Sequence, residues 1–228
     1  MDEVQVFPTP NPLPAGGVYG WHFLPDDGCL AHTEPPIAVE AGCTYQVSGM
    51  IVPCTRGLHG CERVLDTLRY AAGTRLCRTY HSGRIVWEQN KLASRARAVL
   101  WMADATRVLH EFALWCAEQT LALVPEPHPR LLQLLALKRA WLDGCVADDD
   151  LAATRGAVRA ACRGSIWGDP QAALFHAYVI DAVYWAASLY ASNAACNAFG
   201  YGEYTVTYTR ASQELERRCL ALAPEGVL

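Results

Sequence analysis

The hydrophobic period of the chain changes near Trp101, and this change constrains the fold more than any other feature of the sequence. Before it, apolar residues fall in short runs separated by turn residues, as in Val18 to Leu24. After it, apolar residues recur at helical spacing, as in Val108, Phe112 and Trp115. We therefore predict an α+β fold, in which a small mixed α/β domain with a short antiparallel sheet precedes an all-α helical bundle.

The same change divides the chain into three predicted parts. Residues 1–17 carry prolines at positions 8, 10, 12 and 14, which fix an extended path and remove backbone donors. We expect this segment to be a proline-rich N-terminal arm without strands. Residues 18–101 form the predicted α+β domain, and residues 102–228 form the predicted bundle of about five helices.

The elements expected in the first domain are strands over residues 18–24, 37–40 and 45–52, a helix over residues 62–72 and a hairpin over residues 75–88. Gly73 follows the helix where a left-handed cap would sit. Ser82-Gly83 is placed to reverse the chain within the hairpin. Residues 91–101 alternate as a strand does, although their alanine content also suits a helix, and we favour a strand.

The helices expected in the second half carry Val108 to Cys116, Leu131 to Leu142, and residues 151–163, 171–198 and 211–221. His176 and Asp181 fall in the most apolar of these helices. A buried polar group without a partner would cost several kcal/mol. We therefore expect a hydrogen-bond network around both residues, formed with Arg159, Asn193 or Asn197.

The composition narrows the classes of function. A hydrophobic fraction of 52% with 18% charged residues indicates a folded globule. The net charge of -4, without a strongly basic segment, argues against a nucleic-acid partner. The start of the chain lacks the features of a secretory signal, and polar residues interrupt the longest apolar stretch, so we expect a cytoplasmic protein without a membrane partner. The ten cysteines are then expected to be free thiols or metal ligands.

The segment from Cys54 to Gly73 holds the candidate catalytic residues. A glycine turn presents His59, whose imidazole can serve as acid, base or ligand, or can satisfy backbone groups at a junction between strand and helix. Asp66 and Tyr70 follow at a spacing of four residues, which places them on one helix face. They could form a polar cluster with His59 or hold the helix on the sheet. We favour the architectural role for His59.

Zinc binding is a second interpretation of this region. The candidate ligands are Cys54, His59, Cys61 and Cys77, with Cys29, His32, Cys43 and His81 in reserve. Paired Cys-x-x-Cys spacings are absent. We therefore expect the cysteines to behave as small buried hydrophobes, and we predict no cofactor.

A third interpretation is NAD-dependent ADP-ribosyl transfer. Its enzymes are small mixed α/β domains that use a strand-borne histidine or arginine, a tyrosine or serine, and a glutamate. His59, Tyr70 and Glu88 could take these roles. Two features speak against this assignment, because His59 is expected on a turn and Glu88-Gln89 reverses the expected order of the two residue types. No nucleotide-binding glycine loop, Walker motif or Gly-x-Ser-x-Gly elbow occurs in the chain.

Two resemblances to families accompany these motifs. Gly20 to Leu24, Cys54 to Gly73, Arg75 to Gly83 and Asn90-Lys91 together resemble a domain of unknown function common in phage and prophage proteins. That domain is built around a Gly-Leu/Phe-His turn, an Asp-x-Leu helix and a following Tyr-Ala. In the second half, Leu109 to Glu118 and the alanine-rich helix with His176 resemble the helical domain of a predicted toxin-immunity family. The resemblances imply a setting of conflict between phage and host, or between toxin and antidote.

We therefore predict a non-enzymatic accessory protein of a phage or mobile element, located in the bacterial cytoplasm. It would bind another protein, such as a host defence component or a toxin, as an inhibitor or immunity protein does. A homo-oligomer is compatible with the sequence. The alternative is a small enzyme centred on His59, Asp66 and Tyr70.

Overall fold

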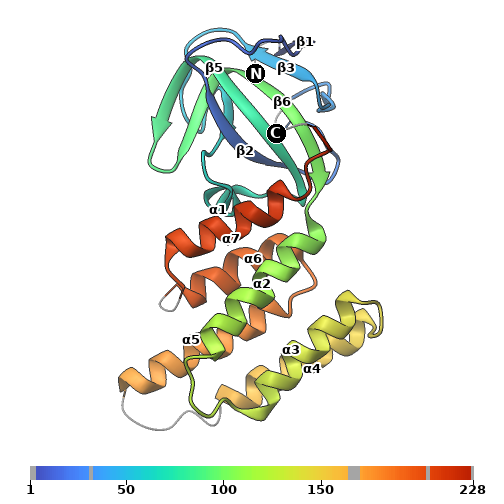
Figure 1. The fold of residues 1–228 in the computed structure, drawn as a ribbon, viewed down its shortest axis with the longest axis vertical. Coiled ribbons are helices and arrows are strands. Elements are labelled where there is room, and N and C mark those ends of the chain that lie inside the picture. The colour runs from blue at the N-terminus through green and yellow to red at the C-terminus, as the bar shows by residue number, and fades with distance from the viewer. Residues whose placement is uncertain (1–3, 31–32, 164–169, 204–205, 227–228) are drawn as a thin grey trace. The chain divides into compact units, whose positions relative to one another are not determined.

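The computed structural model describes residues 4–30, 33–163, 170–203 and 206–226 (Figure 1). The chain divides into two compact units. Residues Met1–Ala105 and Leu215–Leu228 make up the first, here called the sheet unit, and Thr106–Glu214 make up the second, the helical unit. The predicted α+β fold, with a sheet followed by helices, is confirmed. Among the described residues, no helix is long and apolar enough to span a membrane.

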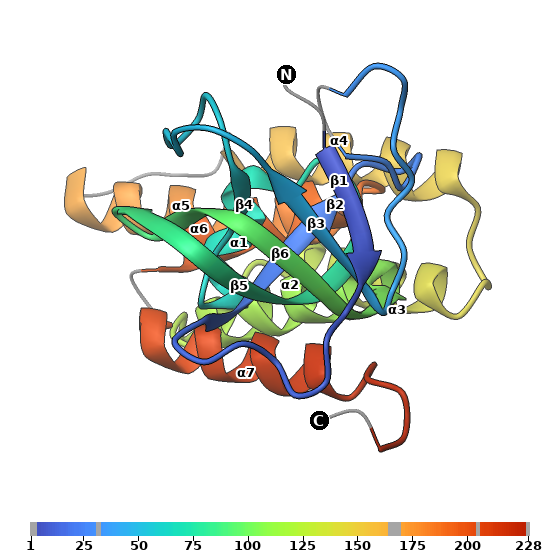
Figure 2. The same cartoon turned by 90° about the horizontal axis from the view of Figure 1, so that it is seen from above.

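The sheet unit holds an antiparallel sheet of six strands. They are β1 (Val4–Pro8), β2 (Val18–Leu24), β3 (Cys43–Val47), β4 (Leu58–Gly60), β5 (Arg75–Glu88) and β6 (Lys91–Asp104). The strands lie in the order β1-β3-β6-β5-β2, and β4 also pairs with β6. Figure 2 shows β1 and β3 side by side, next to β6. Both β4 and β3 pair with β6, at successive positions along it.

Four of these strands close into a ring. β2 pairs with β5, β5 with β6, and β6 with β4. An isolated bridge between Trp21 of β2 and Cys61, the residue after β4, closes the ring. The two residues exchange backbone N–H···O hydrogen bonds of 2.8 and 3.1 Å. Inside the ring lies the buried imidazole of His81, and a Cβ added to Gly60 would come within 2.4 Å of its Nε2. Only glycine fits at position 60.

An apolar cluster fills the same side of the sheet. Its buried members are Leu24, Leu30, Val39, Tyr45, Val47, Ile51, Leu58, Cys77, Ala93 and Val99. They come from β2, β3, β4, β5 and β6 and from the loops between them. Burial of these side chains stabilises the ring, at about 25 cal/mol for each Å² of apolar surface removed from water.

Several predictions about the first hundred residues were wrong in detail. Residues 4–8 form the edge strand β1, although we predicted no strand before residue 18. Val4, Val6 and Phe7 suit a strand, and an edge position tolerates Pro8 because its missing N–H leaves no ladder bond unmade. Residues 37–40 make only an isolated bridge, at Ala38, in place of the predicted strand.

The predicted hairpin over residues 75–88 is one continuous strand. β5 pairs along its length with β6, and the chain turns after it at Gln89 and Asn90. Gly83, at φ +74°, lies in an irregularity between Ser82 and Ile85, where the register with β6 shifts. The glycine therefore bends the strand and does not reverse it. The strand predicted over residues 91–101 is confirmed as β6.

The helix predicted over residues 62–72 is shorter than expected. It consists of α1 (Val64–Thr67) and the 3₁₀ turn η1 (Leu68–Tyr70). The predicted left-handed cap at Gly73 is wrong, because its φ is not positive. A side chain at this position would instead meet the carbonyl oxygen of Leu24 at 2.6 Å. Gly73 is thus required by close packing against the end of β2.

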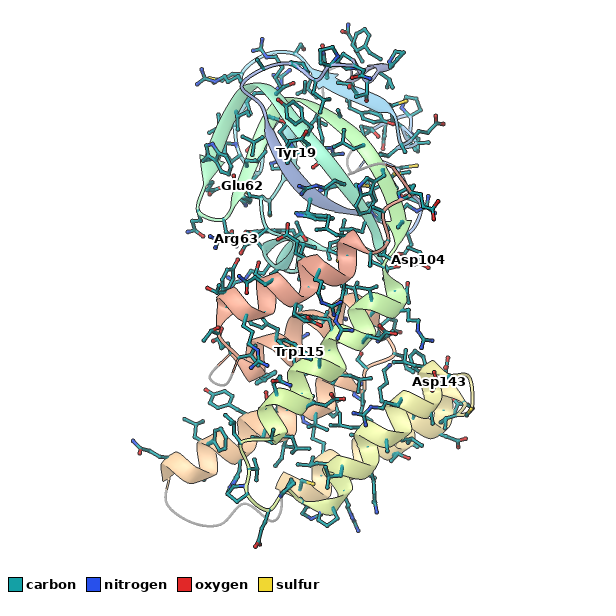
Figure 3. All side chains as sticks on the ribbon, in the orientation of Figure 1. Tyr19, Glu62, Arg63, Asp104, Trp115 and Asp143 are labelled. Carbon is teal, nitrogen blue, oxygen red and sulfur yellow. The ribbon has the colours of Figure 1, made fainter. Side chains whose placement is uncertain are left out.

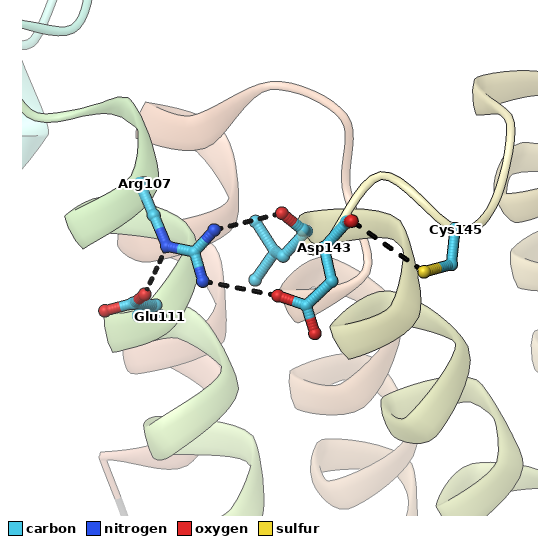
Figure 4. Close-up of polar contacts among 5 residues, drawn as sticks. Arg107, Glu111, Asp143 and Cys145 are labelled. Carbon is cyan, nitrogen blue, oxygen red and sulfur yellow. Dashed lines mark hydrogen bonds and ion pairs between the residues drawn. The ribbon is translucent and has the colours of Figure 1, made fainter.

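The second half of the chain forms helices, as predicted. They are α2 (Thr106–Leu121), α3 (Pro129–Leu142), α4 (Asp148–Arg163), α5 (Pro170–Ala186), α6 (Ala191–Gly202) and α7 (Tyr208–Leu220). Trp115 of α2, labelled in Figure 3, stacks on Phe112 and lies 5.4 Å from the guanidinium carbon of Arg210 in α7. Figure 4 shows Arg107 of α2 joined to Glu111 and to Asp143 at the end of α3.

The single helix predicted over residues 171–198 is wrong, because the chain breaks between α5 and α6 at residues 187–190. The fully buried Lys138 donates a hydrogen bond of 2.7 Å to the carbonyl oxygen of Ser188. The Ser188 hydroxyl accepts a bond from the N–H of Tyr190. These side chains satisfy backbone groups that the break removes from the helical ladder.

The network predicted around His176 and Asp181 is confirmed for one residue only. Asp181 is buried and pairs with Arg159 of α4 at 3.0 Å. His176 is exposed and takes no part in this pair. The prediction that His176 is buried was therefore wrong, because it lies on a face of α5 that the helical unit leaves uncovered.

Candidate functional site

One hollow of the sheet unit, lined by the candidate residue His59, has a volume of about 520 Å³. Three basic side chains line it: His22 from β2, His59 from β4 and Arg97 from β6. Apolar side chains such as Val47 and Leu58 line much of the rest, together with Thr33 and Thr55. A mostly apolar wall with a few polar groups, in this range of volume, is typical of a small-molecule site.

Arg97 supplies a buried positive charge to this hollow. The residue is 2% exposed, and its guanidinium donates one hydrogen bond of 2.9 Å to the carbonyl oxygen of His59. Its Nε has no hydrogen-bond partner, and in the described part of the chain no carboxylate pairs with it. Burial lowers the pKa of Arg97, but arginine stays charged in proteins. The hollow is therefore bordered by a cation whose charge is not neutralised.

The two histidines of the hollow are neutral near pH 7. Burial lowers the pKa of His22 and of His59, and the charge of Arg97 lowers both further. The Nε2 of His59 accepts a hydrogen bond of 3.1 Å from the backbone N–H of Cys54. A neutral ring that accepts at Nε2 carries its proton on Nδ1. His59 can thus donate a hydrogen bond from Nδ1.

A second, smaller hollow of about 280 Å³ shares part of this wall. His22, Cys54 and His59 line both hollows, and Tyr70 and Lys91 line only the smaller one. His59 therefore lies at the wall between two spaces. From the sequence we favoured an architectural role for this ring, whereas in the structure the residue lines both hollows.

Lys91 connects the polar groups around the smaller hollow. Its Nζ lies 2.8 Å from the Cys54 sulfur, 3.5 Å from an oxygen of Glu88 and 4.9 Å from the centre of the Tyr70 ring. The hydrogen bond to Cys54 is the main reason that the pKa of Lys91 is raised. Cys54 itself holds a left-handed backbone with φ of +62°, which is uncommon for a residue other than glycine.

Asn90 joins the other two candidate residues. Its side-chain amide donates a bond of 2.9 Å to Asp66, and its amide oxygen accepts one of 3.2 Å from the Tyr70 hydroxyl. His59 is not hydrogen-bonded to Asp66 or Tyr70, but His59 and Tyr70 line the same hollow. The three predicted residues are thus neighbours on one site, connected through Asn90, Lys91 and Cys54.

Of the candidate zinc ligands, Cys54, His59 and Cys61 line the smaller hollow, and Cys77 belongs to the apolar cluster. Among the described residues, no three side chains of His, Cys, Asp or Glu are placed to hold one metal ion. Burial raises the pKa of Cys61 to about 12 and that of Cys77 to about 11, so both are protonated thiols. His81 is bonded through its two ring nitrogens to Ser94 and Thr79. Of the reserve ligands, Cys29 and Cys43 are half-buried, and His32 lies outside the described residues.

His22 and Arg97 were not predicted as site residues. His22 lies in a segment that was assigned as a strand from its apolar residues alone. Arg97 lies in an alternating segment, where charged residues are expected to face solvent. The sequence did contain one indication that Arg97 is buried. Its neighbours Ala96, Ala98 and Val99 are all apolar, so this part of β6 has no polar face on which Arg97 would be exposed. Both faces of this strand segment are buried.

Comparison with known proteins gives one finding. The model of a family described as a domain of unknown function, DUF7666, matches residues 33–111. No curated protein and no solved structure matches the chain. The match includes His59, Asp66, Tyr70 and Arg97, and it ends within α2. The predicted resemblance to a domain of unknown function is confirmed for this segment.

Proposed function

We propose that the sheet unit is the catalytic domain of a small enzyme that acts on a nucleotide, with its reacting groups around His59. The observation that carries this proposal is that His59, Tyr70 and Lys91 line one hollow and that Glu88 forms an ion pair with Lys91. Ionisable side chains gathered at a hollow are the usual setting of acid and base catalysis.

The geometry favours ADP-ribosyl transfer from NAD as the reaction to test first. One of the two arguments against it is removed, because His59 lies in the strand β4 and not on a turn. Contacts with Cys54 and Lys91 bring the three candidate residues together. Cys54 is hydrogen-bonded to His59 and Glu88, and the ammonium group of Lys91 lies over the Tyr70 ring. In the reaction, the bond between the ribose and nicotinamide breaks with its electron pair on nicotinamide. The acceptor then bonds to the ribose carbon and gives its proton to a base, for which Glu88 is the candidate.

The test is release of nicotinamide from NAD by the full chain, measured by chromatography with water or added protein as acceptor. We expect Glu88→Gln and His59→Gln to lower the rate about 10²-fold or more, the range of single acid or base groups. Glu126→Gln changes an exposed carboxylate of the helical unit and serves as the matched control. Absence of nicotinamide release, together with no thermal shift on addition of NAD, would contradict the proposal.

A second candidate function is the predicted one, in which the chain is a phage or mobile-element accessory that binds a host or rival protein. The observation in its favour is that four large apolar side chains of the helical unit, Leu123, Leu132, Leu174 and Tyr190, are each half or more exposed. Large exposed apolar side chains are enriched at protein interfaces. The test is capture of a stoichiometric partner that Leu132→Glu or Tyr190→Glu abolishes, with light scattering to detect self-association.

A further inference from the structure

No anionic side chain among the described residues neutralises the guanidinium of Arg97. The ionisable groups that act on its guanidinium with opposite sign are the Cys77 thiol and the Tyr45 phenol. Burial raises the pKa of both, so neither carries a charge at pH 7. A buried cation without a carboxylate or other anion is costly, and proteins normally pair it. The charge of Arg97 is therefore available to something that enters the hollow.

Other possible hydrogen-bond donors line the same hollow as Arg97. His22 lines the same hollow, and burial and neighbouring charges, without a hydrogen bond from a described residue, act on its ring. His59 has its Nδ1–H to donate, since its Nε2 is occupied by Cys54. Thr55 also lines the hollow and carries a hydroxyl group. His81, by contrast, is sealed behind Gly60 and satisfied by Thr79 and Ser94, so it is not part of this group.

We propose that the hollow of about 520 Å³ is a binding site for a phosphate group of the ligand, held by Arg97, His22 and His59. The planar guanidinium binds phosphate oxygens through paired hydrogen bonds, and the two imidazoles each add one donor. Phosphate offers acceptor oxygens in several directions, which suits donors that come from three different strands. This inference rests on the proposed function in that the phosphate would belong to a nucleotide substrate.

The experiment is titration of the full chain with sodium pyrophosphate and with ADP-ribose, with sodium acetate as a carboxylate comparison. Binding is followed by calorimetry and by the ¹⁵N signals of labelled histidines. We expect the His22 and His59 signals to shift with both phosphate compounds, while those of His128 and His176 in the helical unit stay fixed. ADP-ribose binding without pyrophosphate binding would show that another part of the nucleotide holds the ligand, and it would overturn the assignment of the hollow.

The decisive variant is Arg97→Met, with Arg95→Met as the control on the same strand. Arg95 is exposed and bonds to the carbonyl oxygen of Gly49 outside the hollow. We expect affinity for pyrophosphate to fall about tenfold or more in Arg97→Met, as loss of charge-assisted hydrogen bonds requires, and to be unchanged in Arg95→Met. If Arg97→Met does not fold, Arg97→Lys removes the paired guanidinium donors while it keeps the charge, and His22→Gln removes an imidazole donor; each should weaken pyrophosphate binding relative to Arg95→Met.

The two proposals fail in different ways. Pyrophosphate binding that depends on Arg97, without turnover of NAD, would leave the phosphate site standing and reject the proposed reaction. Turnover of NAD without pyrophosphate binding or dependence on Arg97 would reject the phosphate site alone. Equal weakening in the Arg95 and Arg97 variants would show a general charge effect and would also overturn the site.

Discussion

The backbone N–H of Cys54 donates a hydrogen bond to Nε2 of His59, so the conformation of one residue orients the ring of the other. Cys54 can do this because its backbone lies in the left-handed region, at φ +62°. Its sulfur then meets Lys91 at 2.8 Å. Strained backbone of this kind is more common at functional sites than elsewhere. Cys54 thus positions both the imidazole and the ammonium group at the wall of the smaller hollow.

The left-handed backbone of Cys54 predicts unequal effects of two substitutions. Cys54→Gly keeps the N–H and adopts this backbone freely, so we expect the free energy of unfolding to change by less than about 1 kcal/mol. Cys54→Val should cost about 1–2 kcal/mol more, because a β-branched residue is strained there. Urea unfolding of both variants measures the difference. The same pair of changes at the exposed Cys145, which has an ordinary φ, is the control.

The close approach of Gly60 to His81 predicts a second stability effect. The Cβ of Gly60→Ala would overlap the His81 ring, so we expect a loss of about 1–3 kcal/mol in unfolding free energy. Gly156 lies inside α4 with nothing within 4 Å of an added Cβ. Gly156→Ala should therefore stabilise the protein by about 0.5–1 kcal/mol. Thermal or urea unfolding of the two alanine variants measures the change in the free energy of unfolding. We expect a decrease for Gly60→Ala and an increase for Gly156→Ala.

The sequence predicted the order of elements but not the long-range pairing of the sheet. The strands over residues 18–24 and 91–101 and most helices follow from local periodicity alone. Gly83 carries a turn signal, yet pairing of β5 with β6 along both strands outweighs it and leaves only a distortion. The sequence explained Gly73 as a cap of the preceding helix. The structure shows that glycine is required there because the carbonyl group of Leu24, 49 residues earlier in the chain, lies too close for a side chain. Local patterns do not contain such contacts.

The candidate site was also only half predictable. His59, Asp66 and Tyr70 share one short segment, so their grouping follows from the sequence. Arg97 and His22 join them only because the ring of strands brings β2, β4 and β6 around one interior. Asn90 and Lys91 were noted for their resemblance to a family, and their role as connectors became visible with the turn between β5 and β6.

The ion pair between Arg159 and Asp181 predicts a contrast between buried and exposed charges. Asp181 has a side chain only 7% exposed, so Asp181→Asn leaves Arg159 without its carboxylate and should cost about 1–3 kcal/mol of unfolding free energy. Arg107, in Figure 4, pairs with Glu111 and Asp143 in a much more exposed setting. Arg107→Ala should cost less than about 1 kcal/mol. Similar losses in both variants, measured by urea unfolding, would contradict the role of burial.

Lys138 predicts a pH dependence of stability. It is fully buried, its Nζ lies 3.4 Å from the centre of the Trp141 ring, and it bonds the carbonyl oxygen of Ser188 at the break between α5 and α6. Burial is the main reason that its pKa falls from 10.5 to about 7, and the charge of Arg155 adds to the effect. Between these two values the unfolded chain binds more protons at this site than the folded protein does.

The contribution of Lys138 to the free energy of unfolding should therefore rise with pH from about 7 to 10.5, and be lost as pH falls through about 7. Lys138→Met carries no proton, so the wild-type value minus the variant value should increase across this window in urea unfolding. Lys91→Met is the control, because the pKa of Lys91 is raised from 10.5, so its ammonium is protonated in the folded and the unfolded chain until pH approaches 10.5. A difference between wild type and Lys138→Met that stays constant with pH would mean that Lys138 keeps its charge inside the protein, held by Ser188 and the Trp141 ring.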